Sequence, residues 1–270
     1  MVVRGRQVVK LLAEGADAFR RIGEGLVVLI YHRVGRRAPI DTDLPVDLFA
    51  EQIAFLAEKT NVVTLDEGLR AIESRTSDES SKVAITFDDG TADFVDAALP
   101  VLVRHRVPAM LYLATAFVED QRPFPNGGRP ISWSAVRDAH STGLVSVGSH
   151  THSHALLDRL PPSEVDHELD RSIELIEGEL GVAAAHFAYP KALPGSPLAE
   201  RSVRARFRSA ALAGTRVNEY GATDPYCLAR SPVQASDGMK WFVRKARGGL
   251  ALEDSIRRLV NRRRLRHSDT

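Results

Sequence analysis

Short apolar runs rich in β-forming residues alternate along this chain with segments whose apolar residues recur at helical spacing. We predict strands over residues 26–31, 61–65, 83–87, 108–115, 144–148, 184–189, 209–214 and 226–231. We predict helices over residues 47–59, 66–74, 92–105, 133–141, 161–180, 198–207, 239–247 and 252–265. Alternating strands and helices build a parallel sheet. With 270 residues, we expect one α/β barrel, whose reactive side chains collect at the carboxyl ends of its strands.

The overall composition excludes several classes of protein. Hydrophobic residues make up 44%, and a net charge of +1 provides no global field for nucleic acid. The single cysteine, Cys227, cannot form an intrachain disulfide. No apolar run is long enough for a signal peptide core or a transmembrane helix. We therefore expect a cytoplasmic protein without a nucleic-acid partner. The sequence predicts no oligomeric state.

We divide the chain into a barrel over residues 26–250 and two flanking segments. Residues 1–25 include a predicted amphipathic helix over 7–21, which either packs on the barrel or associates peripherally with a membrane. We predict that residues 251–270 form a basic helix and tail, whose arginines are either solvated or in contact with an anionic surface.

The strand predicted over 83–87 stops at Asp88, Asp89 and Gly90. Two adjacent carboxylates at the edge of a core are costly unless a cation or a proton partner holds them. The alternative is a solvated Asp-Gly turn without function.

Histidines follow two other predicted strands. His32 follows the strand over 26–31, and His150, His152 and His154 follow the strand over 144–148. In one helical turn His150 and His154 would face the same way. Two imidazoles and one carboxylate suit a divalent metal such as zinc, with the other carboxylate free as a general base. A solvated histidine-rich turn, and a His32 bonded to nearby backbone, are the alternatives.

Two of these segments resemble motifs of a known family. Thr86-Phe87-Asp88-Asp89-Gly90 resembles the first motif of the polysaccharide deacetylases, the NodB-homology or carbohydrate esterase family 4 group, and residues 148–154 resemble the second. The resemblance implies a single NodB-like domain with a distorted (β/α)7 barrel. It implies Asp88 as the catalytic base, and Asp89, His150 and His154 as ligands of a divalent metal, with zinc expected first. The implied reaction is hydrolytic N-deacetylation of an N-acetylated amino sugar.

The residues around His32 resemble a branch of that family. Leu29-Ile30-Tyr31-His32 is similar to the opening segment of a circularly permuted branch that includes poly-N-acetylglucosamine deacetylases. The resemblance implies His32 as the general acid.

The third motif departs from the family pattern. In Phe187-Ala188-Tyr189-Pro190-Lys191, Ala188 replaces the arginine that would orient the base, and Lys191 replaces an aromatic residue. The backbone N–H of Lys191 could still serve an oxyanion. Arg230, in a segment that resembles a recurrent Leu-Pro-Arg, either reaches the base or is a structural arginine.

Trp133, Tyr189 and Phe124 are candidates to stack on sugar rings, and the loop over 117–130 is predicted to form a wall of the site. Three alternatives to an active sugar deacetylase stay open. They are an inactive carbohydrate-binding protein on the same barrel, a deacylase of a non-polymeric acylated amine, and a barrel with a purely structural metal site.

Overall fold

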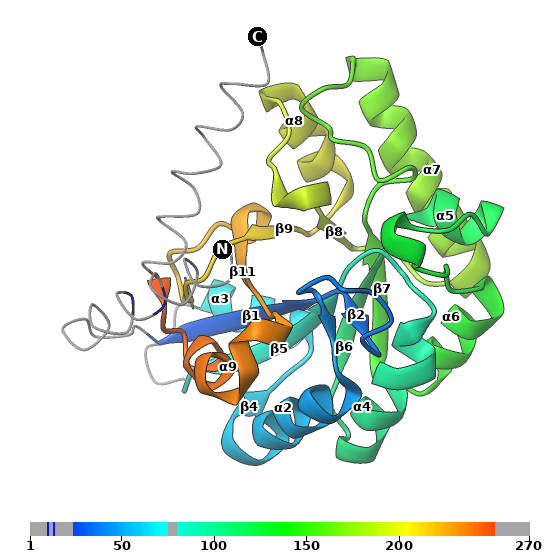
Figure 1. Ribbon diagram of the computed structural model, residues 1–270. Coiled ribbons are helices and arrows are strands. Elements are labelled where there is room, and N and C mark those ends of the chain that lie inside the picture. The colour runs from blue at the N-terminus through cyan, green and yellow to red at the C-terminus, as the bar shows by residue number, and fades with distance from the viewer. Residues whose placement is uncertain (1–9, 11–12, 14–23, 75–79, 252–270) are drawn as a thin grey trace, which may run out of the picture.

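A closed barrel of seven parallel strands forms the centre of the molecule (Figure 1). The structure, a computed structural model, describes residues 10, 13, 24–74 and 80–251. The barrel strands are β1 (Gly25–Tyr31), β5 (Lys82–Phe87), β6 (Ala109–Leu113), β7 (Val145–Ser149), β8 (His186–Ala188), β9 (Ser209–Ala213) and β11 (Leu228–Pro232). Pairing of β1 with both β5 and β11 closes the sheet. The distorted (β/α)7 barrel expected from the resemblance is therefore confirmed.

Four shorter strands accompany the barrel. The strand β4 (Asn61–Val62) pairs with β5, and β10 (Asn218–Glu219) pairs antiparallel with β1. The strands β2 (Arg33–Val34) and β3 (Asp43–Leu44) form a separate parallel pair just after the end of β1.

The side-chain alternation of the strands decides which residues reach the site. In β1, Val27, Leu29 and Tyr31 pack outward under the helices, whereas Leu26 and Val28 belong to the cluster inside the barrel. The same alternation of side chains continues along the strand, so Ile30 and His32 also face inward. Both line a cavity at the end of the strand. In β5 the inward series is Ala84, Thr86 and Asp88. Because β1 and β5 run in register, His32 and Asp88 emerge side by side.

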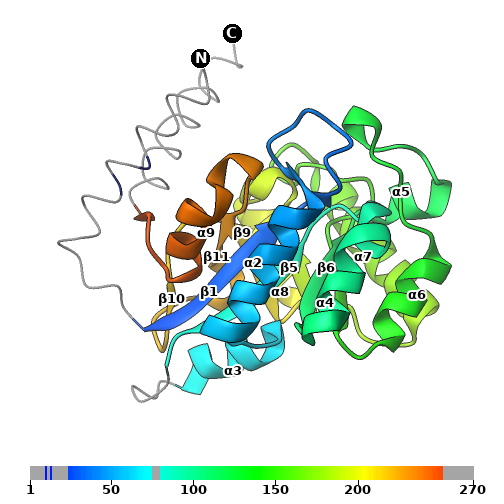
Figure 2. The same cartoon turned by 60° about the horizontal axis from the view of Figure 1, so that its bottom comes forward.

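Eight α-helices are described around the barrel (Figures 1 and 2). They are α2 (Val46–Lys59), α3 (Leu65–Ser74), α4 (Leu99–His105), α5 (Thr115–Asp120), α6 (Trp133–Ser141), α7 (Pro162–Leu180), α8 (Pro197–Arg206) and α9 (Gly238–Ala246). Helix α2 packs between α4 and α9 and covers the outer faces of β1 and β5 through Phe49, Ile53 and Leu56. In the described part of the chain, no helix is long and apolar enough to cross a membrane.

Three local predictions are corrected by the structure. Residues 115–120 form the helix α5, not strand and loop. The predicted helix over 92–105 is a π-helical turn, η1 (Phe94–Ala98), followed by α4, with Pro100 in the first turn of α4 where its missing N–H is harmless. The helix predicted over 47–59 begins one residue earlier, at Val46, so Asp47 lies inside its first turn.

The two flanking segments lie almost entirely outside the described residues. This holds for the predicted helix over 7–21 apart from Lys10 and Ala13, and for the basic segment from residue 252 onward. Lys10 is buried and pairs with the carboxylate of Asp237, while Ala13 packs against Trp241 and Leu250.

Candidate active site

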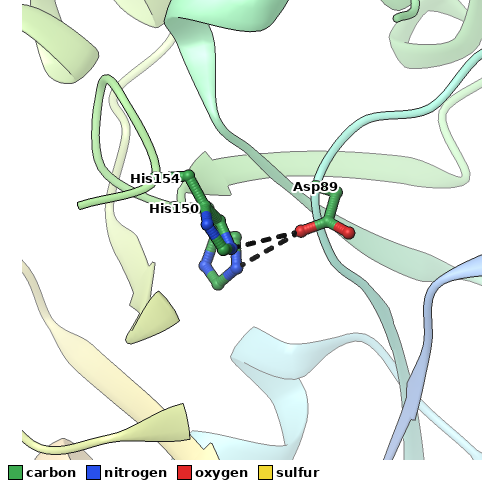
Figure 3. A group of neighbouring side chains, drawn as sticks. All are labelled: Asp89, His150 and His154. Atoms are coloured by element: carbon green, nitrogen blue, oxygen red, sulfur yellow. Dashed lines mark ion pairs between the residues drawn. The ribbon is translucent and has the colours of Figure 1, made fainter. Parts of the chain in front are cut away.

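Asp89, His150 and His154 form a compact group of metal-ligating side chains at the carboxyl ends of β5 and β7 (Figure 3). Oδ1 of Asp89 lies 3.7 Å from Nε2 of His150 and 3.5 Å from Nε2 of His154. Candidate ligand atoms of the three residues all lie within 4.8 Å of one another. Ligands on a metal at bonds of about 2.1 Å are about 3.0–3.5 Å apart, so a small contraction would let all three bind one ion.

A backbone contact orients the ring of His150, and burial sets the charge of His154. Nδ1 of His150 lies 2.7 Å from the carbonyl oxygen of Ala188, so this nitrogen donates and Nε2 is left as the acceptor that faces Asp89. Such a partner fixes the tautomer that a metal ligand needs. Burial, followed by the neighbouring His150, lowers the pKa of His154 to about 4, against the raising effect of Asp89. His154 is therefore neutral at pH 7 and able to bind a cation. The donor set and its orientation thus fit a divalent metal.

The segment between the two histidines is a loop, which corrects the predicted helical turn. Thr151 has a φ of 64° and His154 a φ of 63°, both in the left-handed region. This conformation, not a helical spacing of four, aims both imidazoles at Asp89 (Figure 3). Asp89 itself has a φ of 75°, and strained residues of this kind cluster at functional sites.

Glu168 of α7 holds this loop from behind. Its carboxylate accepts hydrogen bonds from the N–H of Ser153 at 2.7 Å and from the hydroxyl of Ser153 at 2.6 Å. The backbone carbonyl of Glu168 accepts a further bond from the N–H of His152 at 3.1 Å. Glu168 is a functional candidate that was not predicted from the sequence, because nothing in the sequence distinguishes it from the other polar residues of a long helix.

Asp88 is held by Arg230 in a buried, bidentate ion pair. Nη1 of Arg230 donates to Oδ1 at 2.6 Å and Nη2 donates to Oδ2 at 2.8 Å. Nη1 also donates to the hydroxyl of Thr86 at 3.1 Å, and the guanidinium lies over the ring of Tyr112. Burial alone would raise the pKa of Asp88, but Arg230 and His150 more than offset it and lower the pKa to about 2. The arginine that contacts Asp88 therefore comes from β11, not from the segment around Ala188.

Several of the candidate residues line one cavity. It has a volume of about 520 Å³, and its lining includes His32, Asp88, Asp89, His150, His154 and Lys191. Nδ1 of His32 is buried there without a hydrogen-bond partner in the part of the chain that the structure describes. Lys191 sits in a tight turn with a φ of 52°, and the turn's hydrogen bonds come from the N–H groups of Ala192 and Leu193, not from that of Lys191.

Two predicted sugar contacts are not supported. The ring of Tyr189 is buried against Phe187 and its hydrophobic neighbours, because the inward position of β8 belongs to Ala188 and the next side chain points outward. Trp133 begins α6 and packs on the core outside the barrel. Neither lines the cavity. Phe124 does, stacked on Phe117 at 4.2 Å between ring centroids, so the loop over 117–130 does wall the cavity.

Comparison with known proteins identifies the family and agrees with the fold. The family model described as polysaccharide deacetylase matches residues 75–209, which include the strand end with both aspartates and the histidine loop. The chain therefore belongs to the polysaccharide deacetylase family. No curated protein matches it.

Solved structures share this barrel. IcaB from Ammonifex degensii is 24% identical with a TM-score of 0.71, covering 82% of this chain and 98% of that one. The Streptococcus pyogenes deacetylase PplD, in complex with acetate, is 18% identical with a TM-score of 0.72, covering 83% and 99%. A de-N-acetylase from Aggregatibacter actinomycetemcomitans is 18% identical with a TM-score of 0.68, covering 82% and 99%. At these identities the likeness shows the fold alone.

Proposed function

We propose that this protein hydrolyses the N-acetyl group of an amino sugar within an oligosaccharide, polysaccharide or glycoconjugate. The observation that carries the proposal is the meeting, in one cavity, of a three-residue ligand set, a separate ion-paired carboxylate and a histidine. Membership of the family supports an N-acetylated carbohydrate as the substrate.

The three ligands suit a divalent cation, and zinc fits two imidazoles and one carboxylate. When bound, the cation would polarise the acetyl carbonyl and make water at the site more acidic. The other steps belong to the chain's own residues.

Asp88 is the carboxylate left outside the ligand set. Its Oδ2 lies 3.9 Å from Nε2 of His150, beside the ligands, and its low pKa keeps it ionised and able to accept a proton. Asp88 takes a proton from the attacking water, while Arg230 keeps the carboxylate in place. Because Arg230 makes Asp88 a weak base, the proton transfer depends on an acidified water.

The water oxygen bonds to the acyl carbon and the carbonyl oxygen becomes an oxyanion, to which the N–H of Lys191 donates a hydrogen bond. His32, next to Asp88 at the end of β1, gives a proton to the departing nitrogen. The C–N bond breaks, and the products are acetate and a free amino sugar.

The test is acetate release from N-acetylglucosamine oligosaccharides of increasing length. We expect release by the metal-loaded protein, loss of release with a chelator, and recovery when zinc is restored. Metal binding without release from any of them would contradict the sugar deacetylase. In that case, release from small acylated amines would identify the non-polymeric deacylase, and sugar binding without turnover would identify the inactive binding protein.

A further inference from the structure

Lys10 is anchored far from its neighbours in the chain, beside helix α9. Its side chain is only 1% exposed, and its ammonium donates to Oδ1 of Asp237, 227 residues later in the chain. Ala13 is fully buried against Trp241 and Leu250. Because a lysine is rarely buried unless it is paired, the ion pair of Lys10 is a specific attachment and not an incidental surface contact.

Asp237 organises the turn to which Lys10 is attached. It ends the turn η5 (Ala235–Asp237), and its Oδ2 accepts a hydrogen bond from the N–H of Gln234 at 2.8 Å. The ammonium of Lys245 donates to Oδ1 of Asp237 at 3.0 Å and to Oδ2 at 2.8 Å. The carboxylate of Asp237 therefore keeps a cationic partner even when Lys10 is replaced.

The loop between β2 and β3, residues 35–42, forms part of the cavity wall through Ile40 and Thr42. Within this loop only the side chain of Ala38 is buried. The carboxylate of Asp43 holds the first half of the loop by accepting hydrogen bonds from two backbone N–H groups. Segments with few buried apolar contacts open at a low cost in free energy, so the position of the second half depends on polar contacts with a neighbouring element.

Asp41 attaches the second half of this loop to η5. Its carboxylate accepts hydrogen bonds from the N–H of Ser236 at 2.9 Å and from the hydroxyl of Ser236 at 2.7 Å. The carbonyl oxygen of Asp41 accepts another from the N–H of Ala235 at 2.7 Å. A series of polar contacts that passes through Asp237 therefore connects Lys10 with the wall of the cavity.

We propose that Lys10 is a positioning residue for substrate binding, which fixes the cavity-lining half of the β2–β3 loop through Asp237 and Ser236. Attachment of Lys10 and occupation of the cavity then stabilise each other, because coupling between two sites is reciprocal. Release of Lys10 loosens the wall without touching the candidate metal ligands or Asp88. The affinity of the cavity for its ligand is thereby set from outside the barrel. That the ligand is an N-acetylated sugar rests on the proposed function.

The first test is backbone hydrogen exchange of the full chain, read residue by residue by NMR. Lys10→Met keeps a side chain of similar length without the charge, and Asp237 keeps Lys245 as its partner, so we expect the variant to fold. The amides of Ser236 and Asp43, which donate to Asp41 and to Ile40, should exchange about tenfold faster than in the wild type.

Two controls separate this effect from a general loss of stability. Exchange at Leu111, inside the barrel strand β6, should be unaltered in Lys10→Met. Lys59→Met removes an exposed lysine of α2 that pairs with Glu58, and it should change none of these rates. Unchanged exchange at Asp43 in Lys10→Met would overturn the proposal, even if Ser236 exchanged faster, because Lys10 would then support only η5.

The second test is the kinetics of acetate release from N-acetylglucosamine oligosaccharides by the metal-loaded protein. Lys10→Met should raise KM about fivefold or more and leave kcat within about twofold of the wild type, because the loop positions the sugar and not the reacting atoms. Asp41→Ala breaks the same series of contacts at the loop. The double variant should therefore raise KM no further than the more damaging single variant. Multiplying effects on KM, or a loss confined to kcat, would overturn the proposal.

The two experiments also distinguish this inference from the proposed function. A wild-type protein that releases no acetate would contradict the proposed function, and the exchange rates would still decide whether Lys10 holds the loop. Acetate release by Lys10→Met with the wild-type KM would overturn this inference and leave the proposed function intact.

Discussion

The guanidinium of Arg230 and the carboxylate of Asp88, 142 residues apart in the chain, meet in a buried two-bond ion pair at the floor of the cavity. Their strands approach the site from opposite sides of β1, and the inward alternation of β5 and β11 brings the two side chains together. This pair places an arginine beside Asp88 and holds its carboxylate ionised, apart from the group formed by Asp89, His150 and His154.

Replacing Arg230 should damage both activity and stability. In Arg230→Met the buried Asp88 loses its partner, which costs about 3–5 kcal/mol of unfolding free energy. A base that is free to shift by about 1 Å should lower kcat about 100-fold. Urea unfolding and acetate release measure the two effects. Arg230→Lys should recover stability better than activity, because a lysine cannot form both bonds. As a control, Arg204→Met breaks an exposed pair with Asp224 and should cost under about 1 kcal/mol.

The ion pair also predicts a pH dependence for the metal-free protein. The folded pKa of Asp88, about 2, is below its usual value of 3.8, so its contribution is complete above pH 4 and is lost as pH falls toward 2. Linkage gives a loss of about 1 kcal/mol by pH 3 and about 2 kcal/mol by pH 2. The gap in unfolding free energy between wild type and Asp88→Asn should narrow by these amounts. A gap that is constant from pH 5 to pH 3 would show that Asp88 is not ion-paired.

Glu168 should tune metal affinity without touching the metal. In Glu168→Gln one acceptor that holds Ser153 becomes a donor, so the loop between the two histidines loosens. Loss of such an outer partner costs about 10- to 100-fold in metal affinity. Competition with a chromogenic chelator measures the dissociation constant. Glu164→Gln, at an exposed position in the first turn of the same helix, should leave it unchanged.

His32 should matter only when the leaving group needs a proton. His32→Gln should lower kcat on an N-acetyl sugar about 100-fold or more, and much less on 4-nitrophenyl acetate, whose leaving group departs as an anion. His105→Gln, a histidine at the end of α4, should affect neither substrate. Equal losses on both substrates would assign His32 a structural role.

The sequence predicted the barrel and the three strand ends because both depend on local patterns. Alternating apolar runs indicate strands, and the carboxyl ends of parallel strands share one rim. The outward direction of the Tyr189 side chain is also predictable from the sequence, because the two-residue alternation of a strand that places Ala188 inside places Tyr189 outside.

Other features depend on contacts that no local pattern encodes. The left-handed residues Thr151 and His154 are maintained by the hydroxyl of Thr151, which accepts a bond from Ala155, and by the hold of Glu168 on Ser153. The pairing of Arg230 with Asp88 depends on the closure of the barrel, which brings β11 and β5 to either side of β1. The stacked Phe117 and Phe124 required the short helix α5, which the sequence pattern did not predict.

The most direct test of the account separates the ligands from the base. Metal content and acetate release are measured on the wild-type protein and on Asp88→Asn and His150→Ala. We predict that the wild type binds one metal and releases acetate, that Asp88→Asn keeps the metal but releases none, and that His150→Ala loses both. Acetate release by metal-loaded Asp88→Asn at the wild-type rate would contradict the assignment of Asp88 as the base and, with it, the account.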